Sequence, residues 1–383
     1  MKGRNKFSFS ISVLVIFVLI GILSPFIAND KPLFCICEGK FQFPVLNEIR
    51  SSQNKFSDLN FNECKKHIYP PIRFRANTID KSLNKAIAPQ IFSKTEIKSP
   101  RHWLGTDNLG RDVAAGMVHG TGIALTVGFI TVFLSLIIGT SIGILAGYYG
   151  DSGIRASWKL YVGLSLILFI TGYYIWMEWV IFSQHLITAL LLFLILIFIL
   201  AGFVMLLKGK SKTNTGMGFP LDMLLMKVIE LRKSIPALFL ILACLNLFKY
   251  GSMWNIILIA TFLGWIEFAR FARAETLNIA GENYIIGARV LGYSDLLILM
   301  KYILPSILPV LVVVACFSAA GVILLESTLS FLGIGLSAED ISWGKMLAQG
   351  RNMKAWWLVV FPGAALFMLI LSLNLIADRM RKD

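Results

Sequence analysis

The chain has 383 residues, of which 56% are hydrophobic and only 15% are charged, and its mean hydropathy is +0.72. A chain this apolar does not suit a water-soluble protein with an ordinary polar surface. The formal net charge of +14 does not indicate nucleic acid, because the cations flank apolar runs instead of forming one soluble patch. We therefore expect an all-α integral membrane protein that contacts lipid and binds no nucleic acid.

The first apolar run covers residues 7–27. The hydrocarbon core of a bilayer is about 30 Å thick, and a helix needs roughly 20 apolar residues to cross it. Lys2, Arg4 and Lys6 precede the run, as in a signal peptide, but the run is longer than usual and no small-x-small cleavage site follows. We expect residues 1–28 to form an uncleaved transmembrane helix.

A long polar segment follows at residues 29–112, and its composition predicts irregular structure with a few short elements. A disulfide between Cys64 and either Cys35 or Cys37 is compatible with an external location. The end of the segment has a turn-like composition, in which Asp accepts backbone N–H bonds and Gly adopts positive φ. The residues concerned are Gly105, Thr106, Asp107, Gly110, Arg111 and Asp112.

The second apolar run, at residues 118–149, belongs to an expected helical segment 113–150. It contains Gly139, Gly143 and Gly147 at four-residue spacing. This spacing aligns small residues on one helix face, where a second backbone can approach closely. We expect close helix packing along this face.

Residues 151–217 contain two apolar runs, 160–182 and 186–207, separated by a short polar step. They predict a transmembrane hairpin that returns to the same side of the membrane. The next stretch, 221–234, is amphipathic, and its charges exclude it from the hydrocarbon. No metal site is expected in the chain, because it has only four His and no H-E-x-x-H pattern.

The last region, 218–383, contains a polar and mostly helical stretch at 270–301. Near its start, Glu267 and Arg270 have the i, i+3 spacing of an ion pair. Further apolar runs are expected at residues 236–248, 254–269, 303–325 and 356–377. The total is eight expected spans, with both termini and the stretch 270–301 in the cytoplasm.

The chain contains no phosphate-binding loop of the form G-x-x-x-x-G-K-[ST] and no G-x-S-x-G nucleophile elbow. We therefore expect a protein that is not an enzyme and that binds no cofactor. If ATP drives its activity, a separate chain must hydrolyse it.

Residues 284–295 read YIIGARVLGYSD, and residues 303–305 read ILP. This pattern resembles the cytoplasmic signature loop of binding-protein-dependent ABC importer permeases, E-A-A-x-x-x-G followed after nine residues by I-x-L-P. Ile286 stands where the family has Glu. The residues that carry the resemblance are Tyr284, Gly287, Ala288, Arg289, Gly292, Leu304 and Pro305.

In that family the loop forms a short helix in a groove of the ATPase subunit, where small residues let the helix sit deeply. The resemblance implies that Arg289 pairs with an acidic group at the rim of the groove.

Further stretches resemble the peptide and nickel importer permeases, in the same order along the chain. They are HWLGTDNLGRD at 102–112, AGYYG at 146–150, FAR at 268–270, LESTLSFLG at 325–333 and SWG at 342–344. The resemblance implies a multi-pass subunit of the bacterial inner membrane. Its partners would be a sister permease, two ATPase subunits that hold ATP and Mg, and an extracytoplasmic peptide-binding protein.

By the same resemblance, the motif ending at Asp112 scaffolds the pore entrance or docks the binding protein, and Glu326 supports an external gate by hydrogen bonds. The family core has six spans, so the hairpin within 151–217 is an insertion. Import of di- or oligopeptides is the expected function, and import of nickel or another small solute is the alternative.

Two rival classes of protein predict different features. An ion-driven secondary transporter would place paired acidic residues or broken helices at the bilayer midplane, and neither is evident. A membrane scaffold would leave the stretch 270–301 unexplained.

Overall fold

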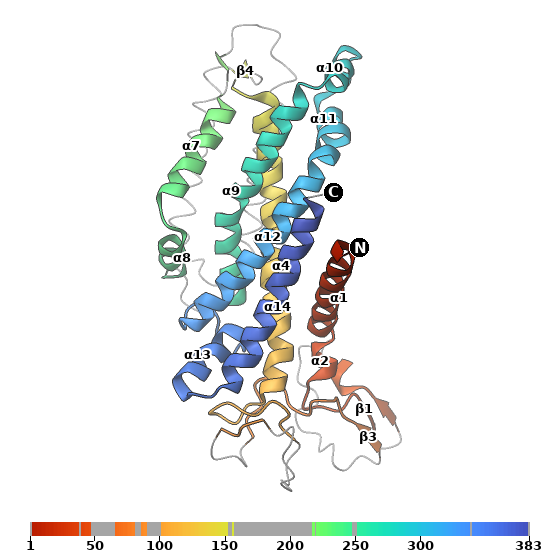
Figure 1. Ribbon diagram of the computed structural model, residues 1–383, viewed down its shortest axis with the longest axis vertical. Helices are drawn as coiled ribbons and strands as arrows, with labels where there is room; N and C mark the ends of the chain where they lie inside the picture. Colours follow the sequence, from red (N-terminus) through yellow and green to blue (C-terminus); the bar gives the residue numbers. More distant parts are fainter. Residues whose placement is uncertain are drawn as a thin grey trace. The chain divides into compact units, whose positions relative to one another are not determined.

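The computed structural model is mainly helical (Figure 1). It describes residues 2–37, 40–46, 66–80, 86–89, 101–151, 155–156, 217–218, 220–246, 251–337 and 339–381. Both runs of the expected hairpin and Cys64 lie outside these residues, so the hairpin and the disulfide remain predictions.

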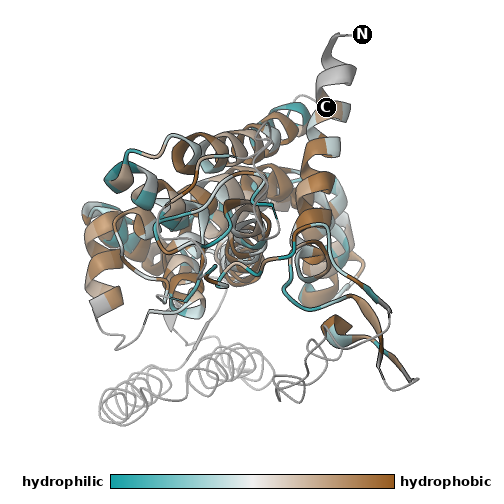
Figure 2. Cartoon of the chain, turned by 90° about the horizontal axis from the view of Figure 1, so that it is seen from below, coloured by the Kyte–Doolittle hydropathy of each residue, from teal (hydrophilic) through white to brown (hydrophobic). Residues whose placement is uncertain are grey.

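Four helical runs of the described residues are long and apolar enough to cross a membrane. They are α4 (Val113–Tyr149), α9 (Met253–Ala280), the continuous run Asp295–Phe331 and α14 (Trp357–Met380). Figure 2 shows hydrophobic colouring along most of the described helices. Four of the eight expected spans are thus confirmed as long apolar helices.

The other expected spans are not confirmed. The apolar part of α1 (Lys2–Ile22) is the shorter stretch Phe7–Ile22. The span expected at 236–248 is α8 (Ala237–Asn246), whose ten residues rise only about 15 Å.

The chain divides into two compact units, and the first comprises Met1–Leu134, Tyr250–Gly264 and Val312–Asp383. In this unit α1 packs on α14, and α13 (Trp343–Met353) also packs on α14. One core cluster contains Val127, Ile256, Ile257 and Leu336.

The polar segment of the first unit starts after the short helix α2 (Ser24–Ile27) and contains a small antiparallel sheet. The strand order is β2-β1-β3. The strands are β1 (Phe34–Cys37), β2 (Lys40–Gln42) and β3 (Lys66–Ile68), with Cys35 opposite both Gln42 and His67. Cys35 is buried.

The second unit comprises Ser135–Lys249 and Trp265–Leu311. The amphipathic stretch forms α7 (Leu221–Ser234), whose buried Leu225 and Ile229 pack with Ala146 and Ala269. Asp222 of α7 forms an ion pair with Arg273 of α9. Two short strands, β4 (Arg155–Ala156) and β5 (Met217–Gly218), pair antiparallel.

The glycine face of α4 packs against α9 in the second unit. A Cβ added at Gly147 would lie 2.8 Å from the carbonyl oxygen of Arg273, and one at Gly143 would lie 2.8 Å from the Cβ of Ala272. A Cβ at Gly139 would meet the backbone of α9 as well. The expected close packing is therefore confirmed, with α9 as the partner helix.

Candidate functional site

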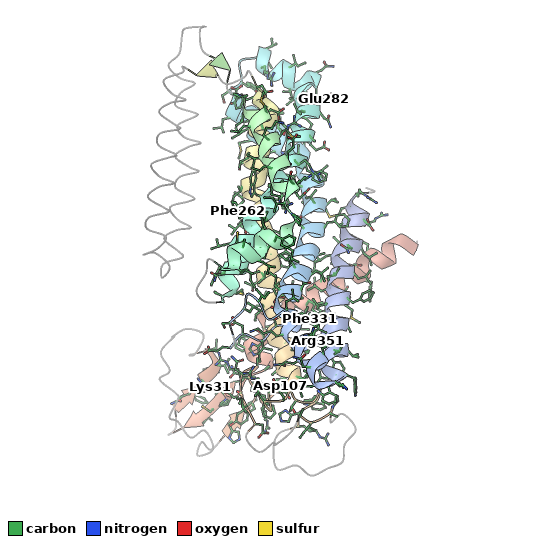
Figure 3. All side chains as sticks on the ribbon, turned by 90° about the vertical axis from the view of Figure 1, so that its left-hand side faces the viewer. Lys31, Asp107, Phe262, Glu282, Phe331 and Arg351 are labelled. Carbon is green, nitrogen blue, oxygen red and sulfur yellow. The ribbon has the colours of Figure 1, made fainter. Side chains whose placement is uncertain are left out.

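The stretch that resembles the signature loop begins where α9 ends. After a turn, Glu282 occupies the N-cap position of α10 (Asn283–Val290), and Figure 3 labels this residue. Ile285 and Ala288 are buried, with 0% and 5% of their surface exposed. One side of α10 is therefore fixed by apolar packing.

The other side of α10 is apolar and exposed. Val290 and Leu291 are 82% and 74% exposed, and Tyr284 and Ile286 are about half exposed. We call these four residues the apolar face of α10. Exposed apolar patches occur at protein–protein and membrane interfaces.

Gly292 ends α10 with a left-handed backbone, φ +79°. Its N–H donates to Arg289 O at 3.0 Å, and the N–H of Tyr293 donates to Ala288 O at 3.1 Å, which is the pattern of a Schellman motif. Positive φ favours glycine, so the backbone supplies a reason for this residue. A Cβ added at Gly287 would meet no neighbouring atom within 4 Å, so this position faces open space.

The chain then turns into α11 (Asp295–Ile298), which Ser294 caps by accepting from Leu297 N at 3.4 Å. A π-helical stretch, η2 (Leu299–Ile303), connects α11 to α12 (Leu304–Phe331). Pro305 lacks a backbone N–H to continue regular helical bonding, and the wider π-helical turn directly precedes it. Leu304 and Pro305 thus lie at the start of a membrane-spanning helix.

Among the residues that the structure describes, Arg289 contacts Tyr148 and forms no ion pair. Its Nε donates to the hydroxyl of Tyr148 at 3.3 Å, and its guanidinium lies 4.6 Å from the centre of the Tyr148 ring. The same hydroxyl donates to Asp295 Oδ1 at 2.9 Å. The expected pairing of Arg289 with an acidic group on another subunit remains a prediction.

The turn-rich motif before α4 forms a compact hydrogen-bonded loop in the first unit. Asp107 Oδ1 accepts from Leu109 N at 2.8 Å and from Arg111 N at 2.9 Å. Asp112 Oδ1 accepts from Ala115 N at 2.7 Å and so caps α4. The carbonyl of Thr106 accepts from the indole of Trp357 at 3.1 Å, which ties the motif to α14.

Two glycines of the motif have a left-handed backbone, with φ +85° at Gly105 and +79° at Gly110. A Cβ at Gly110 would lie 2.9 Å from the carbonyl oxygen of Asp80, and one at Gly105 would lie 3.1 Å from Pro89 N. The motif therefore needs glycine both for its turns and for its contact with the preceding polar segment.

His102 holds this region together, although nothing in the sequence marks it beyond its place in the motif. Its Nδ1 lies 2.7 Å from Asp112 Oδ2, and its Nε2 lies 3.4 Å from Asp80 Oδ2. The ring stacks on Phe74 with a centroid distance of 4.2 Å. Phe74 and Asp112, the outermost residues of this cluster, are 38 positions apart in the sequence, so only the fold brings them together.

A small cavity lies beside the motif in the first unit and is lined by Arg111, Asp340, Lys345 and Gln349, among others. Lys345 Nζ donates to the carbonyls of Asp340, at 2.9 Å, and Ser337. Burial lowers the pKa of Lys345, and the positive charge of Arg111 acts in the same direction, whereas Asp340 opposes them.

Glu326 on α12 has 0% of its surface exposed. Its carboxylate accepts from the hydroxyls of Ser330 at 2.8 Å and Ser327 at 3.3 Å. Gly344 of α13 packs tightly over Ser330, since an added Cβ would lie 2.8 Å from the Cβ of that serine. Near the end of α12, the guanidinium of Arg351 lies 4.7 Å from the centre of the Phe331 ring (Figure 3).

The polar pair expected on α9 is present. The expected pair forms between Arg270 and Glu267, 2.6 Å apart. Within the described ranges, no group of three or more His, Cys, Asp or Glu side chains is arranged to hold a metal ion.

The fold so described is that of a helical membrane protein, and comparison with known proteins assigns its family. Residues 213–382 match the family described as the binding-protein-dependent transport system inner membrane component. A Brucella abortus protein, provisionally named a peptide transport system permease, is 30% identical over 73% of this chain and 72% of its own length.

Two further relatives have related names. The oligopeptide transport system permease protein OppC of Haemophilus influenzae is 28% identical over 73% of this chain and 68% of its own length. The inner membrane ABC transporter permease protein YejE of Escherichia coli is 26% identical over 97% of this chain and 91% of its own length. The chain belongs to the family of ABC importer permeases, which are multi-pass transport subunits of the inner membrane.

Proposed function

We propose that this chain is one permease subunit of an ATP-driven importer of short peptides. It lines the translocation pathway together with a sister permease, and two separate ATPase subunits supply the energy. An extracytoplasmic binding protein delivers the peptide. The proposal is supported by family membership and by relatives named for peptide and oligopeptide transport.

The observation that carries the proposal is the two-sided character of α10. Ile285 and Ala288 fix one side of this helix, while Val290 and Leu291 project an apolar surface outward. In an aqueous cytoplasm this surface needs a partner, and a helix laid in an apolar groove is a common mode of recognition. The ATPase subunit is the partner that fits the family.

Force on α10 has a direct route to the membrane-spanning helices. The chain enters α10 two residues after α9 ends at Ala280, and it leaves through α11 and η2 into α12 without a long flexible connection. A displacement of α10 by the ATPase would therefore move α9 and α12. Such a movement would switch the subunit between inward-open and outward-open states.

On the external side, we propose that the motif from Gly105 to Asp112 scaffolds the pore entrance. Its hydrogen bonds and glycine contacts hold the start of α4 near that of α14. Glu326 would support the gate by fixing its serine neighbours on α12, against which α13 packs. Residues 151–217 would be an insertion in the permease core, and both termini would be cytoplasmic.

The docking surface is tested with a charged substitution on the apolar face. The complex is purified from membranes through a tag on this chain, and the co-purified ATPase is quantified. Val290→Asp should remove most of the ATPase, because it places a carboxylate in an apolar groove. Phe41→Asp is the matched control, since Phe41 is 72% exposed but lies on β2 of the small sheet, away from α10 in the chain.

The result against the proposal is an unchanged amount of ATPase with Val290→Asp together with undiminished ATP-dependent uptake. Gly292→Trp provides a second variant, because a bulky residue with positive φ distorts the end of α10.

Substrate class is tested in vesicles that contain the whole complex and its binding protein. Trialanine should stimulate ATP hydrolysis and accumulate, whereas Ni²⁺ should do neither. Stimulation by Ni²⁺ alone would replace the peptide proposal with the nickel alternative. Accumulation of trialanine by vesicles that contain only this polypeptide would contradict the need for a separate ATPase.

A further inference from the structure

Three motifs that are far apart in the sequence meet at one hydroxyl group in the second unit. Tyr148 comes from the AGYYG stretch at the end of α4, Arg289 from the last turn of α10 and Asp295 from the first turn of α11. The Tyr148 hydroxyl donates to Asp295 Oδ1 at 2.9 Å and accepts from Arg289 Nε at 3.3 Å. One oxygen atom thus links α4 to both short helices of the loop.

The arrangement uses the chemistry of tyrosine fully. The hydroxyl acts once as a donor and once as an acceptor, and the ring face carries the Arg289 guanidinium at 4.6 Å. The charges also suit their helices, because a cation is favourable in the last turn of α10 and an anion in the first turn of α11. Bonds to a charged group are stronger than those between neutral groups.

The backbone next to this contact is closely packed. Gly147, which precedes Tyr148, packs so closely on α9 that an added Cβ would lie 2.8 Å from the Cβ of Thr276. Tyr148 itself is half-buried. The loop is therefore attached to a point where α4 and α9 are in backbone contact, and not to a freely moving side chain.

We infer that Tyr148 is a positioning residue that fixes the orientation of α10 and α11 on the α4–α9 pair, so that a push on α10 is delivered to α4 as well. This inference rests on the proposed function of α10 in receiving force from an ATPase. Without the Tyr148 contacts, α4 would receive that force through α9 and the longer contact of Tyr149 with Asp295, and α10 would tilt under load before α4 moved.

The attachment itself is tested without any partner, by amide hydrogen exchange of the purified chain in detergent. Tyr148→Phe keeps the ring but removes both hydrogen bonds, and exchange in residues 283–298 should rise about tenfold, the factor expected for a lost bond to a charged group. Tyr148→Leu also removes the ring contact and should raise it further. Unchanged protection in both variants would overturn the inference.

Tyr149→Phe is the matched control. The hydroxyl of Tyr149 points to the other oxygen of Asp295, but at 3.4 Å, which is long for an O–H···O bond. Its removal should raise exchange in residues 283–298 by less than about twofold, because the bond is weak. An effect equal to that of Tyr148→Phe would contradict the specific role of Tyr148.

The consequence for transport is tested in vesicles that contain the purified complex and its binding protein, with trialanine as the probe. Tyr148→Phe should retain its ATPase subunits and an unchanged KM for ATP, yet import roughly five- to tenfold fewer peptides per ATP hydrolysed. Asp295→Asn keeps an acceptor for the hydroxyl, so it should lose less of this yield than Asp295→Ala.

The outcomes separate the two proposals. If wild-type complex imports no trialanine with ATP, the proposed function fails, whatever Tyr148 does to hydrogen exchange. If the wild type imports trialanine and Tyr148→Phe has the same yield per ATP, the positioning role is wrong. Loss of the ATPase subunits from Tyr148→Phe would also overturn it, because the residue would then act in docking.

Discussion

A methyl group at Gly143 tests the packing of α4 on α9 most directly. The Cβ of Gly143→Ala would lie 2.8 Å from the Cβ of Ala272, and it would also press on the carbonyl oxygen of Ala269. Carbon atoms in contact lie about 3.5–4.0 Å apart, so the helices must separate by roughly 1 Å. Overpacking of this kind costs about 1–3 kcal/mol, and we expect the upper end because backbone cannot rotate away.

Gly321→Ala is the matched control, because Gly321 lies within α12 and an added Cβ there meets nothing within 4 Å. Alanine favours a helix over glycine by up to about 1 kcal/mol, so this variant should be as stable as the wild type or slightly more so. The free energy of unfolding is measured by titration with SDS in mixed micelles, followed by circular dichroism. Equal stability of Gly143→Ala and Gly321→Ala would refute the packing described between α4 and α9.

Two other predictions concern stability, and a third concerns the segment between β4 and β5. His102→Ala should lower the free energy of unfolding by about 2–4 kcal/mol, because it leaves the buried Asp112 carboxylate without the imidazole and removes a stacked ring. A loss under about 0.5 kcal/mol in the same titration would contradict this expectation. Burial lowers the pKa of Lys345, so the folded state binds this proton less tightly than the unfolded state does. The free energy of unfolding of the wild type, relative to that of Lys345→Met, should therefore rise as pH is raised from neutral toward the ordinary pKa of lysine. A difference that does not change with pH would contradict burial of the ammonium group. Residues 157–216 can be replaced by a short Gly-Ser turn, because β4 and β5 already pair at the two ends of this segment. The shortened chain should insert into the membrane and co-purify with the ATPase as one peak in gel filtration. Aggregation of this variant would indicate that the segment belongs to the permease core.

Local patterns predicted local structure well. The charged and apolar spacing of 221–234 predicted α7 to the residue, and the i, i+3 spacing predicted the contact of Glu267 with Arg270. The glycine spacing of α4 predicted a face for close packing, but not that α9 would fill it. These features depend on neighbours within one or two helical turns, so a local sequence pattern is enough to predict them.

Features that depend on distant partners were not predictable in this way. The contact of Arg289 with an aromatic residue 141 positions away in the chain was not expected, and the pairing of Arg289 with an acidic group of another subunit stays a prediction. The stretch 270–301 was expected to be mostly helical, and α9 does continue to Ala280, but the pattern did not indicate the break between α9 and α10. The cluster around His102 likewise forms only when the polar segment folds back on the start of α4.

The pairing of β4 with β5 has an evolutionary consequence. Arg155 lies opposite Gly218, so the chain departs from the helical bundle and rejoins it at nearly the same place. Because the entropy of closing a loop grows by only about 0.6 kcal/mol for each doubling of its length, such a junction tolerates segments of very different sizes. A lineage could gain, lose or exchange the intervening sequence in a single recombination event, with no change in the order or direction of the helices on either side.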